Sequence, residues 1–305
     1  TPLSQADQDY KSKQKRWSLQ ARICPPYSSL AEHLFMNADN SLNCALPDVQ
    51  SSADGRHIPI QRVGVKSVRV PVVVASVDGP LHTVATVNMY VSLPAGQKGT
   101  HMSRFFRLLD ETREPLCKPV LEDLMARMLK TLDAVSGQIE FDFPFFVRKS
   151  APISKQSSLM SYEAGFTVTC ENGETTVRER VLTPVTSLCP CSKEISRYGA
   201  HNQRSHISID ALCSEALPFE DLIRYSEKNG SCELWSLLKR EDEKFVTEYA
   251  YDHAKFVEDI IRDVATDLNK DARIVSYELQ VENFESIHNH SAYALITHDR
   301  RTSAV

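Results

Sequence analysis

Two cysteines and a histidine form the sharpest chemical cluster in this sequence. Cys189 and Cys191 are separated by one proline, and His201 lies twelve positions after Cys189. A thiolate and an imidazole within reach of one loop suit a borderline-soft divalent ion such as zinc. A structural zinc knuckle would need two Cys-x-x-Cys or histidine pairs, whereas a catalytic site needs three protein ligands and leaves one position for water. The residues alone leave open a metal site, a redox pair and inert buried thiols.

Two further histidines, His288 and His290, lie near the C-terminus. Side chains two positions apart share a face in an extended chain, so the two imidazoles would then point to the same side. Such a pair can bind a metal ion or act as paired general acid and base. The alternative is a pair of exposed histidines at the edge of a strand.

The segment from Gly96 to Arg104 is rich in glycine and in basic residues. Glycine allows the backbone to approach a ligand, and clustered Lys, His and Arg side chains donate hydrogen bonds to phosphate. The segment is not a P-loop, because G-x-x-x-x-G-K-[ST] is absent, as is G-x-G-x-x-G. A solvated basic turn is the alternative explanation.

Two glutamates lie on predicted helical segments. Glu243 belongs to the charge run Arg240–Lys244, which is typical of a solvated face. Glu258 follows Val257 in an apolar helical pattern. From the pattern alone, both are surface residues.

Hydrophobic periodicity predicts the elements that must position these residues. Alternating apolar residues predict strands, and apolar residues three and four apart predict helices. The expected strands are 63–74, 84–93, 139–147, a strand through 166–170 that closes at the hairpin signal Asn172–Gly173, 175–183, 205–210, 274–282 and 291–297. The expected helices begin near Met102 and run over 119–134, 219–229 and 246–268.

The order of these elements repeats along the chain. A shift of 136 positions places Leu121–Leu124 on Val257–Ile260, and the strand 139–147 on 275–283. Two strands, two helices and two strands therefore occur twice, which predicts an α+β fold with antiparallel sheets and helices on one face.

The repeat also predicts the domain organisation. Residues 57–174 would form the first ββααββ unit, and 175–305 the second, which carries most of the candidate metal and catalytic residues. Residues 1–56 are polar and irregular and would form an extension, in which only 30–36 has a helical pattern.

The composition is that of an ordinary globular protein. Of 305 residues, 42% are hydrophobic and 25% charged, which argues against a disordered or fibrous chain. A net charge of −5 excludes the basic field of a general nucleic-acid binder. The longest apolar stretch, Val70–Ala75, is too short for a membrane helix. The N-terminus is polar and lacks the apolar core of a secretory signal. We therefore expect a soluble cytoplasmic protein whose cysteines are mostly buried thiols.

Four longer motifs add a more specific indication. They are Leu46–Ser52, Ile58–Lys66, Leu93–Arg104, and Cys189–Cys191 followed by Gly199–Arg204. Together they resemble the prokaryotic type IB GTP cyclohydrolases over about residues 44–298. The resemblance implies the tunnelling fold, with two ββααββ units per chain, and a homo-oligomer, usually a tetramer, with active sites between subunits.

The resemblance also implies roles for individual residues. A divalent ion, zinc or manganese, would be held by Cys189, His201 and Glu243. Glu258 would anchor the purine, and His288 and His290 would move protons. The candidates for binding the triphosphate and nearby substrate atoms are Lys66, Lys98, His101, Ser103, Arg104, Arg197, Asn202, Gln203 and Arg204. Cys191 could assist proton transfer, order the site or pair oxidatively with Cys189.

The implied reaction is the first step of folate biosynthesis. GTP is hydrated at guanine C8, opened and deformylated, and then closed to 7,8-dihydroneopterin triphosphate. A metal that lowers the pKa of bound water toward 7 would supply hydroxide at neutral pH. The alternatives are a nitrile reductase that acts on a 7-deazaguanine with a nucleophilic cysteine and NADPH, and a GTP-binding oligomer without turnover. A nucleobase deaminase is excluded, because its P-C-x-x-C pattern fails at Cys191.

Overall fold

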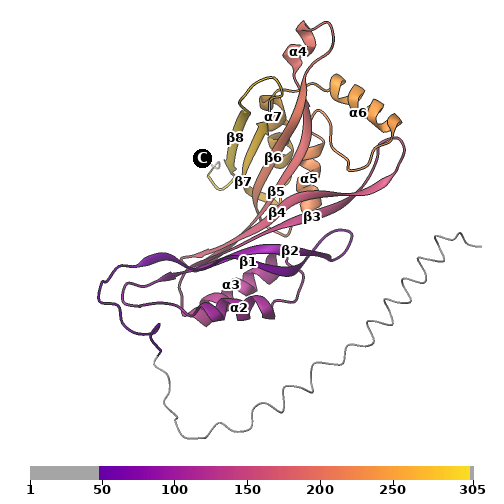
Figure 1. The fold of residues 1–305 in the computed structure, drawn as a ribbon. Helices are drawn as coiled ribbons and strands as arrows, with labels where there is room; N and C mark the ends of the chain where they lie inside the picture. The colour runs from indigo at the N-terminus through magenta and orange to yellow at the C-terminus, as the bar shows by residue number, and fades with distance from the viewer. Residues whose placement is uncertain (1–47, 303–305) are drawn as a thin grey trace, which may run out of the picture. The chain divides into compact units, whose positions relative to one another are not determined.

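Eight strands form one antiparallel sheet within residues 48–302, the part of the chain that the computed structural model describes (Figure 1). The strand order follows the chain, so each strand pairs with its sequence neighbours. The strands are β1 (Ile60–Val74), β2 (Leu81–Leu93), β3 (Gly137–Ser150), β4 (Ser157–Glu171), β5 (Glu174–Leu188), β6 (Asn202–Cys213), β7 (Ile274–Asn283) and β8 (Ala292–Asp299). All the predicted strands are present, and most are longer than predicted.

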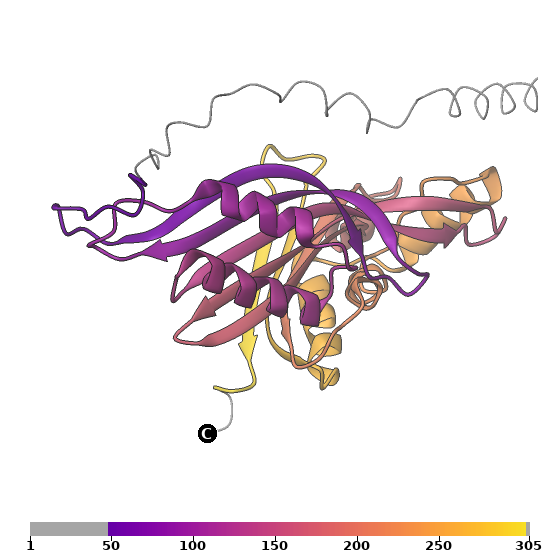
Figure 2. The same cartoon turned by 90° about the horizontal axis from the view of Figure 1, so that it is seen from below.

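Helices pack against both halves of this sheet. α2 (Met102–Glu111) and α3 (Lys118–Leu132) lie side by side on the first half, and α5 (Phe219–Glu227) and α7 (Val257–Lys270) pack on the second (Figures 1 and 2). Two further helices are α4 (Pro190–Ile195) and α6 (Arg240–Asp252). No helix within 48–302 combines the length and apolar character that crossing a membrane requires.

The element order confirms the predicted α+β class. Strands β1 and β2, two helices, and β3 and β4 make the first half. The second half repeats this pattern, with α4 inserted between β5 and β6 and one more helix before β7. The halves meet at Asn172–Gly173, whose φ angles of 52° and 81° suit a tight hairpin. The unit limits at 57, 174 and 305 stay predictions, and the pattern at 30–36 lies outside the described residues.

Strand alternation determines which face is buried. In β2 every second side chain from Ala85 to Leu93 is buried, and those between are half-buried. Buried residues of α3 and α7 join the strand residues in one continuous hydrophobic core, so these helices cover the same face. Large apolar side chains outside this core are exposed at Val84, Leu159, Tyr293 and Leu295.

The predicted helix 246–268 is wrong in one respect, because the chain forms two helices, α6 and α7, with a break between them. Within the break the backbone N–H of Lys255 donates to the carbonyl of Leu188 at the end of β5, at 3.1 Å. The N–H of Phe256 donates to the side chain of Asp259, which caps α7 (3.0 Å). Apolar residues continue on both sides of the break, so periodicity alone could not locate it.

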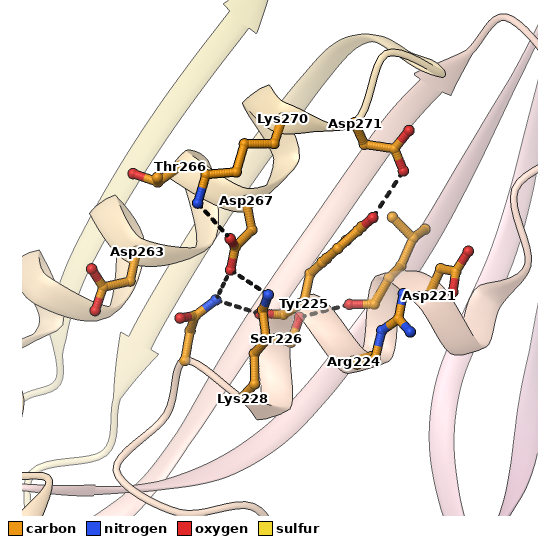
Figure 3. A network of polar contacts seen from close by, with 12 residues as sticks. Asp221, Arg224, Tyr225, Ser226, Lys228, Asp263, Thr266, Asp267, Lys270 and Asp271 are labelled. Carbon is orange, nitrogen blue, oxygen red and sulfur yellow. Dashed lines mark hydrogen bonds and ion pairs between the residues drawn. The ribbon is translucent and has the colours of Figure 1, made fainter.

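A polar network fixes α7 against α5 (Figure 3). Asp267 of α7 accepts hydrogen bonds from Lys228 and Asn229, both at 2.8 Å. Burial opposes ionisation of Asp267, but these bonds and a contact with Lys270 outweigh it and lower the pKa of its carboxyl. The Tyr225 hydroxyl donates to Asp271 at 2.9 Å. The network holds the far half of the helix that carries Glu258 in its first turn.

Candidate functional site

The candidate site residues lie at two opposite ends of the sheet. β5 ends, β6 begins and β7 ends on the same side, because Leu188 pairs with Asn202 and Ser205 pairs with Asn283. We call this side the Cys189 end; α4 projects from it in Figure 1. The loop 94–101, between β2 and α2, leaves the sheet on the opposite side, which we call the loop end. A strand as long as β5 spans about 45 Å, so the two ends do not meet within one chain.

Cys189 and His201 are neighbours at the base of the loop between β5 and β6. The backbone N–H of Cys189 donates to the carbonyl of His201 at 3.1 Å. The Cys189 Sγ accepts the backbone N–H of Ser192 at 3.4 Å, and the Ser192 hydroxyl accepts the N–H of His201 at 3.3 Å. Cys189 is half-buried, Cys191 is exposed, and both are free thiols. The structure therefore brings the predicted thiol and imidazole together and contains no disulfide between the two cysteines.

A chain of hydrogen bonds sets the tautomer of the His201 ring. The Glu285 carboxylate only accepts, so the Gln203 amide donates its Nε2–H to Glu285 Oε1 at 3.4 Å. The Gln203 oxygen then lies 3.0 Å from His201 Nδ1, which must carry the proton. Nε2 of the neutral ring keeps its lone pair, as in histidines that bind metals. Ser286 also lies near Nδ1, at 3.4 Å.

Glu258 reaches the Cys189 end because of the break before α7. Lys255 bonds to the carbonyl of Leu188, next to Cys189, and Glu258 follows three residues later in the first turn of the helix. Glu258 is exposed, and it makes no side-chain hydrogen bond or ion pair within the described residues. Its carboxylate is thus available to two N–H donors of a ligand.

His288 and His290 lie in the loop between β7 and β8, also at the Cys189 end. Both are exposed, and their rings stack with centroids 5.1 Å apart and planes 18° from parallel. The loop is not the extended strand considered for this segment, but it holds the two imidazoles together. They can therefore act as a pair on one ligand.

Glu243 does not join Cys189 and His201 in this chain. It lies in the first turn of α6, where the neighbouring Asp242 accepts the Ser154 hydroxyl at 2.6 Å. α4 contacts the opposite end of α6, because Lys193 Nζ donates to the carbonyl of Tyr251 at 2.6 Å. Glu243 and Tyr251 are about 12 Å apart along the helix axis. Within 48–302 no three His, Cys, Asp or Glu side chains gather into a metal-binding group.

The residues at the Cys189 end fit a divalent ion in part. A cysteine sulfur and a histidine Nε2 with a free lone pair are ligands that zinc accepts. Glu285 lies on the Nδ1 side of His201, with its Oε2 at 4.0 Å, so it orients the ring and is not placed beside Nε2. One chain thus offers two of the three predicted ligands close together, and the third ligand, a carboxylate, must be added to them.

The predicted phosphate-binding residues of the first half lie away from the Cys189 end. His101 Nε2 lies 3.3 Å from the Asp48 carboxylate, and the Arg104 guanidinium donates to the carbonyl of Thr131 at 2.9 Å. Lys66 is exposed on β1, and Lys98 and Ser103 are exposed around the loop 94–101. One chain therefore does not bring Lys66, Lys98, His101, Ser103 and Arg104 together with Cys189 and His201.

The other candidates lie at the Cys189 end but differ in orientation. Arg197 is exposed in the loop after α4, and Asn202 and Arg204 are exposed on β6. Gln203 lies between them, is only 8% exposed and contacts His201. Gln203 is thus placed to position the imidazole rather than to bind a substrate directly.

Sequence reasoning gave no role to Glu285, Ser286 or Ser192. Glu285 begins the segment that contains the two histidines. This closeness in sequence was the only signal that could have pointed to a role for Glu285. Its contact with Gln203 depends on the pairing of β6 with β7, which joins residues far apart in the chain.

Comparisons with known proteins agree with the motifs. A family model described as type I GTP cyclohydrolase folE2 matches residues 46–294. GTP cyclohydrolase FolE2 from Ralstonia nicotianae is 60% identical over 256 residues, which cover 84% of this chain and 96% of the relative. The Burkholderia ambifaria protein of the same name is 58% identical over 268 residues, with 87% and 100% covered.

Among solved structures, uricase from Arthrobacter globiformis matches with a TM-score of 0.49 and 11% identity, over 80% of this chain and 95% of that chain. No inference follows from a likeness at this level. The family match names folE2, where the motifs suggested the label type IB. With the match covering most of its length, the chain belongs to the type I GTP cyclohydrolase folE2 family.

Proposed function

We propose that this protein is a GTP cyclohydrolase that hydrolyses GTP at guanine C8, releases formate and closes the product to 7,8-dihydroneopterin triphosphate. The family match carries this conclusion, because residues 46–294 include both ends of the sheet and every candidate site residue. The relatives named GTP cyclohydrolase FolE2 align over nearly their whole length.

The free carboxylate of Glu258 supports a role in selecting the base. Guanine presents its N1–H and 2-amino group side by side, and one ionised carboxylate can accept both. Adenine lacks this pair of donors. We therefore assign Glu258 to guanine recognition at the start of α7.

His288 and His290 support the proton transfers that the reaction requires. Ring opening and re-closure both move protons, and two exposed, stacked imidazoles can give and take them near neutral pH. Cys191 is a free thiol within two residues of Cys189, and we assign it a supporting role in the same site.

A divalent metal, zinc or manganese, is part of the proposal. It would supply a Lewis acid that lowers the pKa of water. Cys189 and His201 would hold it, because they are adjacent and His201 keeps Nε2 free. Glu243 would be the third ligand. For Glu243 to reach Cys189 and His201, either α6 must move or several chains must assemble.

The separation of the two ends supports a site shared between chains. The loop end carries Lys98, His101 and Arg104 for the triphosphate, and the Cys189 end carries the residues for the base together with Arg197 and Arg204. We propose that the loop end of one copy meets the Cys189 end of another in a homo-oligomer, a tetramer as the family resemblance implies. The finer type IB label and a cytoplasmic location belong to the same proposal.

The direct test is incubation of the purified chain with GTP, with formate and pterin fluorescence after oxidation as readouts. We expect both products, their loss on chelation, and their return when zinc or manganese is added. Cys189→Ala should lose activity and metal together, whereas Glu258→Gln should weaken GTP binding and retain the metal. A chelated, metal-free protein with full activity would refute the metal assignment, and absence of formate would refute the function.

A further inference from the structure

A cavity of about 200 Å³ lies where the two halves of the described chain meet on the helix-covered face. Its walls come from the end of β1, the start of α3 and the start of α5. Most of the lining is apolar, including Ala75, Leu116 and Leu217. None of the residues assigned to the GTP site lines it.

The cavity contains a buried carboxylate that lacks a full set of partners. Glu179 occupies a core position in β5, between Val177 and Val181, and is only 4% exposed. Its Oε2 has no hydrogen-bond partner within the described residues. Buried polar groups are nearly always paired, so this oxygen is available to a donor from a ligand.

The nearby charges do not neutralise Glu179. Burial raises its pKa to about 7, although the Leu217 backbone N–H and the charges of Lys118 and Arg273 act in the opposite direction. Lys118 Nζ is already bonded to the carbonyls of Cys213 and Ser214, at 2.8 and 3.0 Å. Arg273 is paired with acidic groups, Asp221 at 3.1 Å and Asp271 at 2.6 Å. Burial also raises the pKa of the Cys213 thiol to about 12, so that thiol is neutral.

A second carboxylate is hydrogen-bonded to residues of the cavity wall. Glu220 Oε1 accepts the Ser76 hydroxyl at 2.6 Å and the Val77 N–H at 3.0 Å, and both of these residues line the cavity. The buried Oε2 of Glu220 has no partner within the described part of the chain. Lys118 also lines the cavity, but its ammonium is already bonded to two carbonyls, so the unpaired oxygen of Glu179 favours a cation over an anion.

Aromatic rings complete the lining. Phe166 and Phe219 both border the cavity, with ring centroids 5.0 Å apart. Aromatic faces attract ammonium and amidinium groups, and a carboxylate adds a charge-assisted hydrogen bond. A cavity of roughly 150 Å³ can hold benzene, so the volume here suits a ring with one short polar arm.

We propose that this cavity is a binding site for a small organic cation, an amine or amidine on a benzene-sized apolar group, whose N–H donates to Glu179. Such a ligand would contact both halves of the sheet and stabilise their junction. The site is independent of the GTP site, so its failure would leave the proposed activity untouched.

The test uses the full chain at pH 8, with benzylamine as the probe and benzyl alcohol as its uncharged counterpart. Calorimetry and thermal unfolding should show binding and a raised Tm with benzylamine and much weaker binding with the alcohol. Glu179→Gln should weaken benzylamine binding by about tenfold or more, since a charge-assisted bond is lost. The control Glu174→Gln changes an exposed carboxyl of the same strand and should bind as the wild type does.

A second variant tests the cavity itself. Ala216 is exposed and lines the cavity, so Ala216→Trp should obstruct it without disturbing the core, whereas Val135→Trp adds the same group at an exposed position outside the lining. Loss of binding only in Ala216→Trp is expected. Equal binding of amine and alcohol, undiminished binding by Glu179→Gln, or no binding by either probe would overturn the proposal.

Discussion

At the scale of single residues, the site depends on how one imidazole is held. His201 has its Nδ1 proton fixed by Gln203, whose amide is oriented in turn by Glu285. This assignment starts from Glu285, because an ionised carboxylate can only accept hydrogen bonds. The Gln203 amide nitrogen must then face Glu285, and its oxygen must face His201. The sequence identified His201 as a candidate ligand but not the two residues that orient it.

Gln203→Leu should therefore lower metal affinity and turnover by about 10- to 100-fold, the usual cost of losing an outer partner of a ligand. Metal titration and formate release would measure this. The matched control is Gln280→Leu, which changes a half-buried glutamine on β7 that bonds to Glu278. Equal metal affinity in the two variants would remove Gln203 from the positioning role.

Glu179 predicts a pH effect on stability. Its pKa is raised to about 7, above the unfolded value near 4.3, so the native state binds more protons between these pH values. The free energy of unfolding should therefore fall as pH rises through this window, by at most about 4 kcal/mol. Urea unfolding should show Glu179→Gln more stable than the wild type at pH 8, with a smaller difference at pH 5. A constant difference at both pH values would contradict this assignment.

At the scale of elements, the strands could be predicted well because burial on one face leaves a period of two in the sequence. The helices were harder to delimit. α6 and α7 share a continuous apolar pattern, and the break between them is set by the bond from Lys255 to Leu188, which no local pattern reveals. This long-range bond also brings Glu258 to the Cys189 end.

The N-terminus of α6 has an anchor whose removal can be tested. Asp242 is fully buried and accepts the backbone N–H groups of Ile153 and Ser154, both at 2.8 Å. Burial opposes its charge, but these bonds and those from Ser154 Oγ and Lys239 keep the pKa of Asp242 below its usual range. Asp242→Asn should lower the Tm by several degrees, measured by calorimetry at pH 7. Glu241→Gln, in the exposed part of the same turn, should leave the Tm unchanged; an equal loss would show that α6 does not depend on Asp242.

At the scale of the whole molecule, the candidate residues are separated into two ends. The type and order of residues predicted a GTP cyclohydrolase, and the family model that matches is type I GTP cyclohydrolase folE2. The sequence could not show that Lys98 and Cys189 lie at opposite ends of a sheet, because this follows from the antiparallel pairing of strands far apart in the chain. Whether Glu243 completes the metal site stays a prediction.

A shared site predicts that two inactive variants complement each other. Lys98→Glu alters the loop end and Cys189→Ala alters the Cys189 end, so each alone should be nearly inactive. When the two are unfolded and refolded together in equal amounts, random assembly should restore about a quarter of wild-type turnover, since some sites receive both intact ends. Refolding each variant separately is the control. Activity that stays at the level of the separate variants would show that each chain builds its own site.

The sequential order of the strands has a consequence for synthesis of the chain. Because β1 to β4 pair only with their neighbours along the sequence, the first half of the sheet can assemble while the second is still being translated. β5 can then add to the exposed edge of β4 as it leaves the ribosome, followed by β6 to β8. Growth in one direction gives each new strand a template and keeps the unpaired edge short-lived, which limits aggregation before translation ends.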